Sequence, residues 1–487
     1  MIKQWQFPGG IALNGHKQLT EISESTLPSE LIYPLLQRSD CYASPIVHQG
    51  QRVLKGEVIA SSQNPTATPI HAASSGVIKA IAPRIIAHPS GLADTCIIIE
   101  TDGLNEAYPA NPCVNYQLET PEELRNKIAL AGVVGLGGAA FPTAVKLQAQ
   151  QPIHTLIING AECEPYISCD ASLIQACAQQ IVQGALIMQY ILQAESCIIA
   201  IENTMHIAQQ ALLEAANQQN IQLVTVPTIY PTGGEKQLIE VLTGIKIPPS
   251  ILPATHGFVC QNVGTAYAIY QAICLGIPLT ERVITVTGKG INLAKNIRAK
   301  IGTPIKHLVE QCGGYTQNIQ RLIMGGSMMG IALSSDDIAV IKATNCLLAM
   351  TSSDLAEGQP AMPCIRCGDC ATVCPTELLP QQLYWYSRSN QYEQCLDYQL
   401  FDCIECGCCD IVCPSHIPLV QSFRAAKGEL IIKEKHAAQA NIAKKRYQNQ
   451  QQRRLKEEQE KLAKAEKRQA AIDKMKAAAA NRKKADY

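Results

Sequence analysis

Two cysteine-rich runs near the C-terminus carry residues whose type and spacing suit iron–sulfur chemistry. Residues 364–375 (CIRCGDCATVCP) and 403–414 (CIECGCCDIVCP) both follow the pattern Cys-x2-Cys-x2-Cys-x3-Cys-Pro. In bacterial ferredoxins, three cysteines of such a run bind one [4Fe–4S] cluster and the fourth binds the other cluster. The two runs therefore predict two [4Fe–4S] clusters, each of which accepts and donates one electron at a time.

The exchange of the fourth cysteine between the runs decides which thiolates share a cluster. We predict the ligands of one cluster as Cys364, Cys367, Cys370 and Cys413, and those of the other as Cys403, Cys406, Cys409 and Cys374. Zinc also binds paired Cys-x2-Cys motifs, but the third cysteine and the following x3-Cys-Pro fit a zinc site poorly. Cys408, beside Cys409, is expected to be a non-ligand.

Four polar loops upstream are candidates for the site that supplies electrons to the clusters. The segment 132–146 (GVVGLGGAAFPTAVK) contains four glycines and ends in a lysine. Glycines let the backbone approach a phosphate and present its amides to it, although such a loop alone is more often an ordinary turn. The segments 158–166, 230–244 and 259–269 add polar loops at the ends of other expected strands. Four such loops could enclose a cofactor at one edge of a doubly wound sheet.

The order of these motifs resembles the FMN- and NADH-binding subunit of respiratory complex I. Together with the flanking domains, nearly the whole chain resembles the RnfC family, the C subunits of the Rnf (Rsx) ion-translocating electron-transport complexes. The resemblance implies FMN-binding positions at Gly135, Gly137, Gly138, Lys146, Asn159, Glu162, Asn262 and Thr265. It implies NADH-binding positions at Phe141, Glu164 and Glu235. An ordinary core aromatic residue is the alternative interpretation of Phe141.

The sequence departs from the complex I pattern at four positions within these motifs. An arginine, a glycine, an aspartate and a further acidic residue of that family are replaced by Leu136, Ala140, Ala161 and Gly234. The flavin contacts that the family makes at these four positions are therefore not carried over to this chain.

The pattern of apolar residues predicts a multidomain α/β and α+β protein. Short alternating runs punctuated by glycine predict an all-β, lipoyl-like scaffold domain of the barrel-sandwich type over residues 1–115. Its connecting segment QNPTATP has no lysine that could carry a lipoyl or biotinyl group. Alternating strands and helices predict an α/β domain that binds FMN and NADH over residues 116–280. We expect the remaining parts to be a β-grasp (soluble ligand-binding) module over 281–350, a ferredoxin-like domain with two [4Fe–4S] clusters over 351–426, and a basic helical or disordered tail over 427–487.

Charge is unevenly distributed, although the 487-residue chain has a formal net charge of zero. From Lys427 to the end there are eighteen Lys and Arg against eight Asp and Glu, so the rest of the chain is acidic. A basic tail indicates contact with an anionic surface, either lipid headgroups or a protein partner; a solvated helix without a partner is the alternative. We expect no membrane span and no secretory signal, and the twenty-one cysteines then favour a reducing compartment.

The resemblance implies a peripheral, NADH-side component on the cytoplasmic face of the bacterial inner membrane. Electrons would pass as hydride from NADH to FMN and then singly through the clusters to other subunits, including a second iron–sulfur subunit. The whole complex would couple this flow to ion transport. Hydride transfer needs no protein acid or base, so we expect no catalytic residue in that sense, and no contact with nucleic acid. Two alternatives remain open: a soluble flavin/iron–sulfur reductase such as a cobalamin reductase, and a non-catalytic scaffold that the clusters brace.

Overall fold

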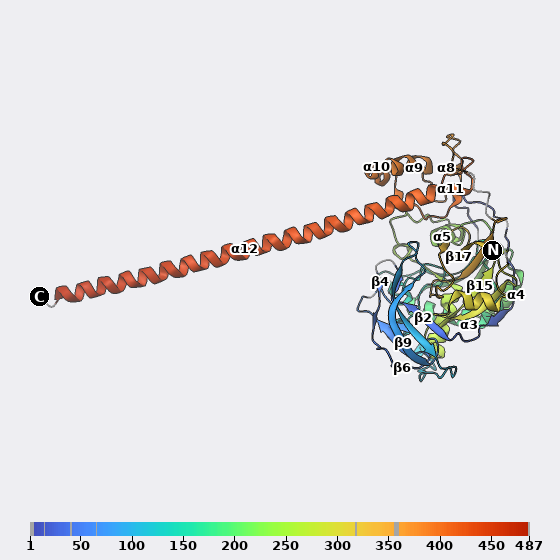
Figure 1. The fold of residues 1–487 in the computed structure, drawn as a ribbon, viewed down its shortest axis with the longest axis horizontal. Coiled ribbons are helices and arrows are strands. Elements are labelled where there is room, and N and C mark those ends of the chain that lie inside the picture. Colours follow the sequence, from blue (N-terminus) through green and yellow to red (C-terminus); the bar gives the residue numbers. More distant parts are fainter. Residues whose placement is uncertain are drawn as a thin grey trace.

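The computed structural model consists of a globular body from which one long helix projects (Figure 1). The structure describes residues 4–13, 15–38, 41–64, 66–316, 319–354 and 360–485. The body combines an all-β domain, an α/β domain, a mixed sheet of six strands and a small helical domain that carries the cysteine runs.

The N-terminal domain is built from short antiparallel strands. One sheet has the order β2 (Glu30–Pro34), β10 (Ala93–Thr101), β9 (Gly76–Ile85) and β6 (Arg52–Val53). Smaller sheets join β5 (Ser44–Pro45), β7 (Val58–Ser61) and β8 (Ile70–His71), and β3 (Leu36–Arg38) with β4 (Cys41–Tyr42). Successive side chains of a strand point to opposite faces, and those that face inward, such as Leu31, Ile78 and Ile97, are fully buried.

The α/β domain contains a parallel sheet in the order β13 (Gln222–Val226), β12 (Ser196–Glu202), β11 (Thr155–Gly160) and β14 (Phe258–Asn262). One face packs on α1 (Pro121–Leu130), α3 (Cys169–Leu192), α4 (His206–Ala215) and α6 (Val263–Cys274), and the other face packs on α5 (Glu235–Thr243). The strand order reverses at β11, which has β12 on one side and β14 on the other. Ligands of such sheets bind beyond the carboxyl ends of the strands at this reversal.

Helix α3 is the one helix in the described part of the chain whose length and composition would suffice to cross a membrane. However, 67% of its most apolar window is buried inside the protein. The helix lies so close to α6 that a Cβ on Gly184 would stand 1.9 Å from the carbonyl oxygen of Ala266. We conclude that α3 is a core helix of the α/β domain.

The β-grasp region forms a mixed sheet in the order β1, β16, β15, β19, β17, β18. Strands β15 (Glu281–Thr287), β16 (Lys295–Lys300), β17 (Ile319–Met324), β18 (Ile331–Leu333) and β19 (Cys346–Thr351) lie with helix α7 (Ile305–Gln311) around a separate apolar core. The edge strand β1 (Ile22–Glu24) comes from the N-terminal part of the chain and pairs in parallel with β16. This N-terminal segment therefore lies outside the all-β domain.

The residues before β1 run across the α/β domain to the cysteine-rich domain. We call residues 4–13 and 15–21 the N-terminal strap. The amide of Gly10 donates to the carbonyl of Val373 at 3.0 Å, and Ile11 exchanges two backbone hydrogen bonds with Tyr230. The strap thus connects the α/β domain with the cysteine-rich domain through backbone atoms.

A buried lysine makes a second joint between domains. The ammonium of Lys342, in the β-grasp region, donates to the carbonyls of Pro69 at 2.8 Å and Gly132 at 2.7 Å. Burial lowers the pKa of Lys342 to about 7. One side chain therefore holds the all-β domain, the α/β domain and the β-grasp region together.

The two cysteine runs have the same local fold. Each forms a loop, then a glycine with positive φ (90° at Gly368 and 81° at Gly407), then a one-turn helix, α8 (Asp369–Thr372) or α11 (Cys408–Ile411). Helices α9 (Pro380–Arg388) and α10 (Tyr392–Asp397) cover them. Helix α12 (Leu419–Ala485) starts against this domain and then extends alone as the long arm of Figure 1.

Gly184→Ala should destabilise the α/β domain, because the new Cβ would overlap the carbonyl oxygen of Ala266. Overpacking of this kind costs about 1–3 kcal/mol, so we expect a lower midpoint of thermal unfolding by circular dichroism. Gly428→Ala in α12 is the matched control, since a Cβ there meets nothing within 4 Å. Equal midpoints for the two variants would contradict the close contact of α3 with α6.

Candidate cofactor cavity and iron–sulfur sites

A cavity of about 1020 Å³ opens at the carboxyl ends of β11 and β14. The glycine-rich loop and the loops after β11, before α5 and after β14 form most of its wall. The hairpin between β17 and β18 (residues 325–330) forms another part, and the cysteine-rich domain contributes residues from 375–377 and 399–404. Cavities that bind a small ligand measure roughly 300–1,000 Å³, so this one, at the upper end of that range, is large enough for a nucleotide cofactor.

The glycine-rich loop brings backbone atoms to the cavity. Gly135, Gly137 and Gly138 all line it, and Gly138 has a φ of 108° with open space where a Cβ would stand. A ligand can therefore approach this backbone closely. Thr265 lies behind the loop: it is fully buried, and its hydroxyl accepts the amide of Leu136 at 2.9 Å. Thr265 positions the loop rather than lining the cavity.

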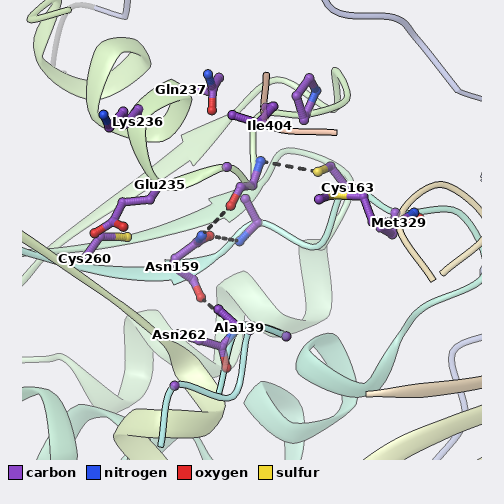
Figure 2. A pocket seen from close by; sticks show the side chains of 18 of the residues that line it. Ala139, Asn159, Cys163, Glu235, Lys236, Gln237, Cys260, Asn262, Met329 and Ile404 are labelled. Atoms are coloured by element: carbon purple, nitrogen blue, oxygen red, sulfur yellow. Dashed lines mark hydrogen bonds between the residues drawn. The ribbon is translucent and has the colours of Figure 1, made fainter. Parts of the chain in front are cut away.

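Two predicted residues of opposite charge contact each other in the cavity. Lys146, the last residue of α2 (Thr143–Lys146), forms an ion pair with Glu235 at 2.8 Å. Glu235 is the first residue of α5 and lies beside Cys260 (Figure 2). The N-terminus of a helix favours anions, so a phosphate entering here would compete with Glu235 for Lys146.

Two asparagines organise the polar loops at the ends of β11 and β14. Asn159 donates to the carbonyl of Gly233 and accepts the amide of Ala161, both at 2.9 Å (Figure 2). Asn262 caps α6 and donates to Asp170 at 2.6 Å. Both asparagines line the cavity, so the same amide groups fix the loops and make this part of the wall polar.

The two glutamates of the loop after β11 have different partners. Glu162 is only 7% exposed and accepts the amide of Asp170 at 3.0 Å, at the start of α3. Glu164 accepts the amides of Met328 and Met329 in the β17–β18 hairpin, each at 3.0 Å. Burial raises the pKa of both carboxyl groups. Both residues line the cavity, and Glu164 also ties the α/β domain to the hairpin.

Phe141 lines the cavity where the all-β domain approaches it. The guanidinium carbon of Arg38 lies 5.1 Å from the centre of the Phe141 ring, a distance typical of a cation–π contact. The predicted aromatic residue therefore stands at an interface between two domains, with part of its surface open.

Three further residues belong to the wall; the sequence marks Gln261 as a polar residue of the segment 259–269 but does not single out Cys163 or Tyr230. Cys163 accepts the amide of Gly233 at 3.3 Å (Figure 2). Tyr230 is 2% exposed, and its hydroxyl donates to the carbonyl of Cys406 at 2.7 Å. Gln261 is 3% exposed, and among the described residues none accepts a hydrogen bond from its Nε2. All three lie within the polar loops that the sequence marks, which is the one signal that points to them.

The cysteines of the two runs gather in two groups of four. One small cavity, the first cluster site, is lined by Cys364, Cys367, Cys370 and Cys413. The other, the second cluster site, is lined by Cys374, Cys403, Cys406 and Cys409. The fourth cysteine of each run therefore lies with three cysteines of the other run, an arrangement in which four thiolates can hold a cubane. Cys408 is fully buried and borders the second site.

The two cluster sites have different surroundings. Residues next to the second site, including Pro375 and Ile404, belong to the wall of the large cavity. The ammonium of Lys427 also lies there, where it donates to the carbonyl of Cys403 at 2.6 Å. At the first site, Cys367 is exposed and Ile365 is 68% exposed. The second site thus faces the cavity, and the first site reaches the surface.

The donor groups fit a flavin nucleotide and two iron–sulfur clusters. Each cluster site offers four thiols, the number that a [4Fe–4S] cubane requires. The large cavity offers open glycine backbone, a lysine ammonium and the amide of Gln261, whose Nε2 has no acceptor among the described residues. Buried polar groups are normally hydrogen-bonded, so the unpaired amide indicates a ligand that accepts its hydrogen bond.

Comparison with protein families identifies four matching regions in chain order. They are the RnfC barrel sandwich hybrid domain at residues 5–104, the Nuo51 FMN-binding domain at 128–271, the SLBB domain at 283–332 and the 4Fe-4S dicluster domain at 363–417. These matches confirm the predicted fold class and the predicted FMN and [4Fe–4S] cofactors.

Three similar proteins are named as the C subunit of an ion-translocating oxidoreductase complex. The protein from Pseudomonas aeruginosa is 44% identical over 452 residues, which cover 92% of this chain and 58% of the relative. Those from Yersinia enterocolitica (45% identity, 92% and 65% covered) and Klebsiella pneumoniae (44% identity, 93% and 60% covered) are similar. The chain thus spans about 58–65% of the length of these relatives.

Two solved structures of NAD+-reducing [NiFe]-hydrogenase are distant matches. The air-oxidised form is 18% identical with a TM-score of 0.41, covering 58% of this chain and 53% of that one. The H2-reduced form is 16% identical with a TM-score of 0.42, covering 66% and 63%. A likeness at this level assigns no function.

Serine variants of the two exchanged cysteines test the grouping of the thiols. Cys374→Ser should remove the cluster of the second site and Cys413→Ser that of the first, so each variant should keep one cluster by iron analysis. The electron paramagnetic resonance spectrum of reduced Cys374→Ser should match that of Cys406→Ser, and the spectrum of Cys413→Ser should match that of Cys367→Ser. If the spectrum of Cys374→Ser instead matched that of Cys367→Ser, and that of Cys413→Ser matched that of Cys406→Ser, the exchange of ligands between the runs would be wrong.

Proposed function

Homology over 92% of its length places the chain in the RnfC family, the C subunits of ion-translocating oxidoreductase complexes, and we propose that it moves electrons between NAD(H) and partner redox subunits through FMN and two [4Fe–4S] clusters. The observation that best supports this is the make-up of the cavity wall. Loops of the matched FMN-binding region and loops beside the second cluster site line the same space of about 1020 Å³. A flavin bound there would lie next to an acceptor of single electrons.

In this proposal the FMN-binding residues divide into direct and supporting ones. The backbones of Gly135, Gly137 and Gly138 and the ammonium of Lys146 hold the flavin phosphate, while Thr265 fixes the glycine-rich loop from behind. Asn159, Glu162 and Asn262 form the polar wall that orients the ring system. Bound FMN would supply the conversion of a two-electron hydride into single electrons, which the clusters require.

The NADH-binding residues line the open remainder of the cavity. Phe141 offers an aromatic face, and Glu235 lies at the helix end where the dinucleotide phosphates would compete for Lys146. The carboxylate of Glu164 is engaged by the hairpin amides. We therefore assign to Glu164 the role of holding the cavity wall against which NADH binds.

The two clusters act in series, with the second site first. The side chain of Tyr230 lines the cavity, packs against Cys406 and Cys408 and donates to the Cys406 carbonyl. Tyr230 is therefore the residue that would separate a flavin in the cavity from a cluster at the second site. The first site then passes electrons outward, because Cys367 and Ile365 lie at the surface, where they are accessible to a second iron–sulfur subunit.

The proposed location is peripheral, on the cytoplasmic face of the bacterial inner membrane, as part of a complex that couples electron flow to ion transport. The name of the relatives and the basic arm α12 support it. In this arrangement residues 1–115 act as a scaffold, 116–280 bind FMN and NADH, 281–350 form the β-grasp module, 351–426 carry the clusters and 427–487 provide a basic docking arm.

NADH should reduce both clusters of the purified full chain once FMN is bound, and the visible absorbance of the clusters should bleach. Riboflavin, which lacks the phosphate, is the ligand control. Lys146→Met should weaken FMN binding about 10- to 100-fold, since hydrogen bonds to charged groups contribute about 1.5–3 kcal/mol, and should leave riboflavin binding nearly unchanged. Bleaching by dithionite but not by NADH with FMN would refute the proposed electron transfer.

The order of the clusters predicts different behaviour for the two exchanged-cysteine variants. Electron transfer slows steeply with distance, so Cys413→Ser, which keeps the second-site cluster, should be reduced by NADH as fast as the unmodified chain. Cys374→Ser keeps only the first-site cluster, and its reduction should be at least several-fold slower in stopped-flow absorbance. Faster reduction of Cys374→Ser than of Cys413→Ser would reverse the order.

A further inference from the structure

Two carboxyl groups, that of the buried Glu162 and that of the half-buried Asp170, lie together beneath the cavity, and the proposed hydride transfer uses neither as an acid or base. Glu162 comes from the loop after β11, and Asp170 lies in the first turn of α3. Their oxygens and the sulfur of Cys169 all lie within 4.8 Å of one another. Glu162 and Asp170 both line the cavity.

The surroundings of the pair suit one negative charge and one proton better than a metal ion. Glu162 accepts the first-turn amides of α3, at 3.0 Å from Asp170 and 3.4 Å from Ala171, and such amides stabilise a carboxylate. The ammonium of Lys17 donates to the carbonyl of Glu162. Arg282 is buried nearby and donates to the carbonyl of Leu136 at 3.1 Å. These positive charges oppose a further cation.

We expect Asp170 to be the member of the pair that keeps the proton, because Glu162 accepts two first-turn amides of α3 that favour its carboxylate. Burial, and then the charge of Glu162, raise the pKa of Asp170 well above that of an ordinary aspartate. Its Oδ2 accepts the amide of Asn262 at 2.6 Å, so the carboxyl group is fixed in orientation against the cavity. Cys169 does not compete for this role, because burial also raises the pKa of its thiol.

Asp170 separates the large cavity from a second, small one. The small cavity measures about 20 Å³. Its polar lining is Asp170, Tyr267, Gln271, Glu281, Arg282 and Arg298, and Cys169 and apolar groups complete the wall. A cavity needs about 10–15 Å³ to hold one water molecule. One water there could bridge Asp170 and the polar groups on the far side.

Those polar groups lead to the surface. The Tyr267 hydroxyl accepts from Gln271 at 3.3 Å and from Arg298 at 3.2 Å, which leaves its own proton free to donate. Arg298 lies 3.8 Å from Glu281 and 3.0 Å from Glu24, whose side chain is 72% exposed. These contacts therefore connect Tyr267 to the surface, away from the cavity mouth, and a water molecule in the small cavity would complete the connection to Asp170.

A second observation indicates a ligand on the cavity side of the pair. Gln261 lines the cavity and is buried, and within the described residues its Nε2 has no acceptor. An unpaired buried amide costs about 1–3 kcal/mol, a cost that is removed when a ligand with a carbonyl or ring nitrogen binds. The acid pair thus lies beside a place built for a polar ligand.

We propose that Asp170 exchanges the proton that accompanies reduction of a flavin in the cavity, and that the small cavity with Tyr267 and Glu281 connects Asp170 to bulk water. This inference rests on the proposed function. Hydride from NADH brings two electrons and one hydrogen to FMN, one further proton comes from the Oδ of Asp170, and both protons are released when two single electrons pass to the clusters. Glu162 keeps its charge throughout and holds Asp170 ready to be protonated again from the small cavity.

An infrared titration of the full chain without flavin tests whether Asp170 holds a proton. We expect a carboxylic acid band that titrates well above the usual aspartate value of about 3.9 and that is lost in Asp170→Asn. The exposed Asp337, paired with Lys306 at the surface, gives the matched control Asp337→Asn, which should keep the band. Burial also raises the pKa of Glu162 and Glu164, so the test is the difference between the spectra of the unmodified chain and of Asp170→Asn. Identical carboxylic acid bands in the two spectra would overturn the proposal.

Proton uptake during reduction tests the route. With FMN bound and NADH added in stopped flow, a pH indicator should report the uptake of one proton as the flavin is reduced, before electron transfer to the clusters releases both protons. This uptake should be about 100-fold slower in Asp170→Asn, the size typical of a lost proton donor. Tyr267→Phe leaves Asp170 in place and serves if Asp170→Asn does not fold; it should slow uptake at least several-fold. Unchanged uptake in Tyr267→Phe overturns the route through the small cavity.

The two proposals fail in different ways. If the unmodified chain binds FMN but NADH does not reduce it, the proposed function is wrong while the infrared band still reports on Asp170. If NADH reduces the flavin and uptake in Asp170→Asn matches that of Asp337→Asn, the proton route is wrong and the electron-transfer function stands.

Discussion

Electrons pass between a flavin and an iron–sulfur cluster only when the two are held a short distance apart with little water between them. In the proposed function the Tyr230 side chain would meet that requirement, since this residue lines the cavity and its buried hydroxyl donates to the Cys406 carbonyl at 2.7 Å. The hydrogen bond satisfies the hydroxyl inside the protein, so no water is needed there. The relative placement of the other domains matters because it holds Tyr230 between the cavity and the second cluster site.

Three kinds of contact maintain that placement. The N-terminal strap joins the α/β domain to the cysteine-rich domain through backbone hydrogen bonds at Gly10 and Ile11. Glu164 binds the amides of the β17–β18 hairpin, and Lys342 holds carbonyl groups of two other domains. Each contact places a polar or charged group in the interior, where breaking it would leave an unpaired partner at a cost of about 1–3 kcal/mol or more. The joints are therefore specific as well as stabilising.

Several charged or polar side chains with unpaired atoms or shifted pKa values line the cavity or border it. Lys146 and Glu235 pair across it, Gln261 has an unpaired amide among the described residues, and Glu162 and Asp170 share one buried site. A core selected for stability alone would avoid these arrangements, whereas functional sites retain them. The same distribution explains why the cavity could hold a charged cofactor and also handle a proton.

The sequence alone determined the features that depend on short spacings. The two cysteine runs fold as equivalent loops because the spacing and the glycines at 368 and 407 act within a few residues, and alternating strands and helices predict the parallel sheet. Only the tertiary structure decided which residues far apart in the sequence contact one another. Thr265 lies behind the glycine-rich loop, and Glu164 binds amides of the β17–β18 hairpin. Strand β1 pairs with β16 and not with the all-β domain. The second cluster site faces the cavity where Tyr230 contacts Cys406, 176 positions further along the chain. Such contacts depend on how whole domains pack, and no local pattern of residue types encodes that packing.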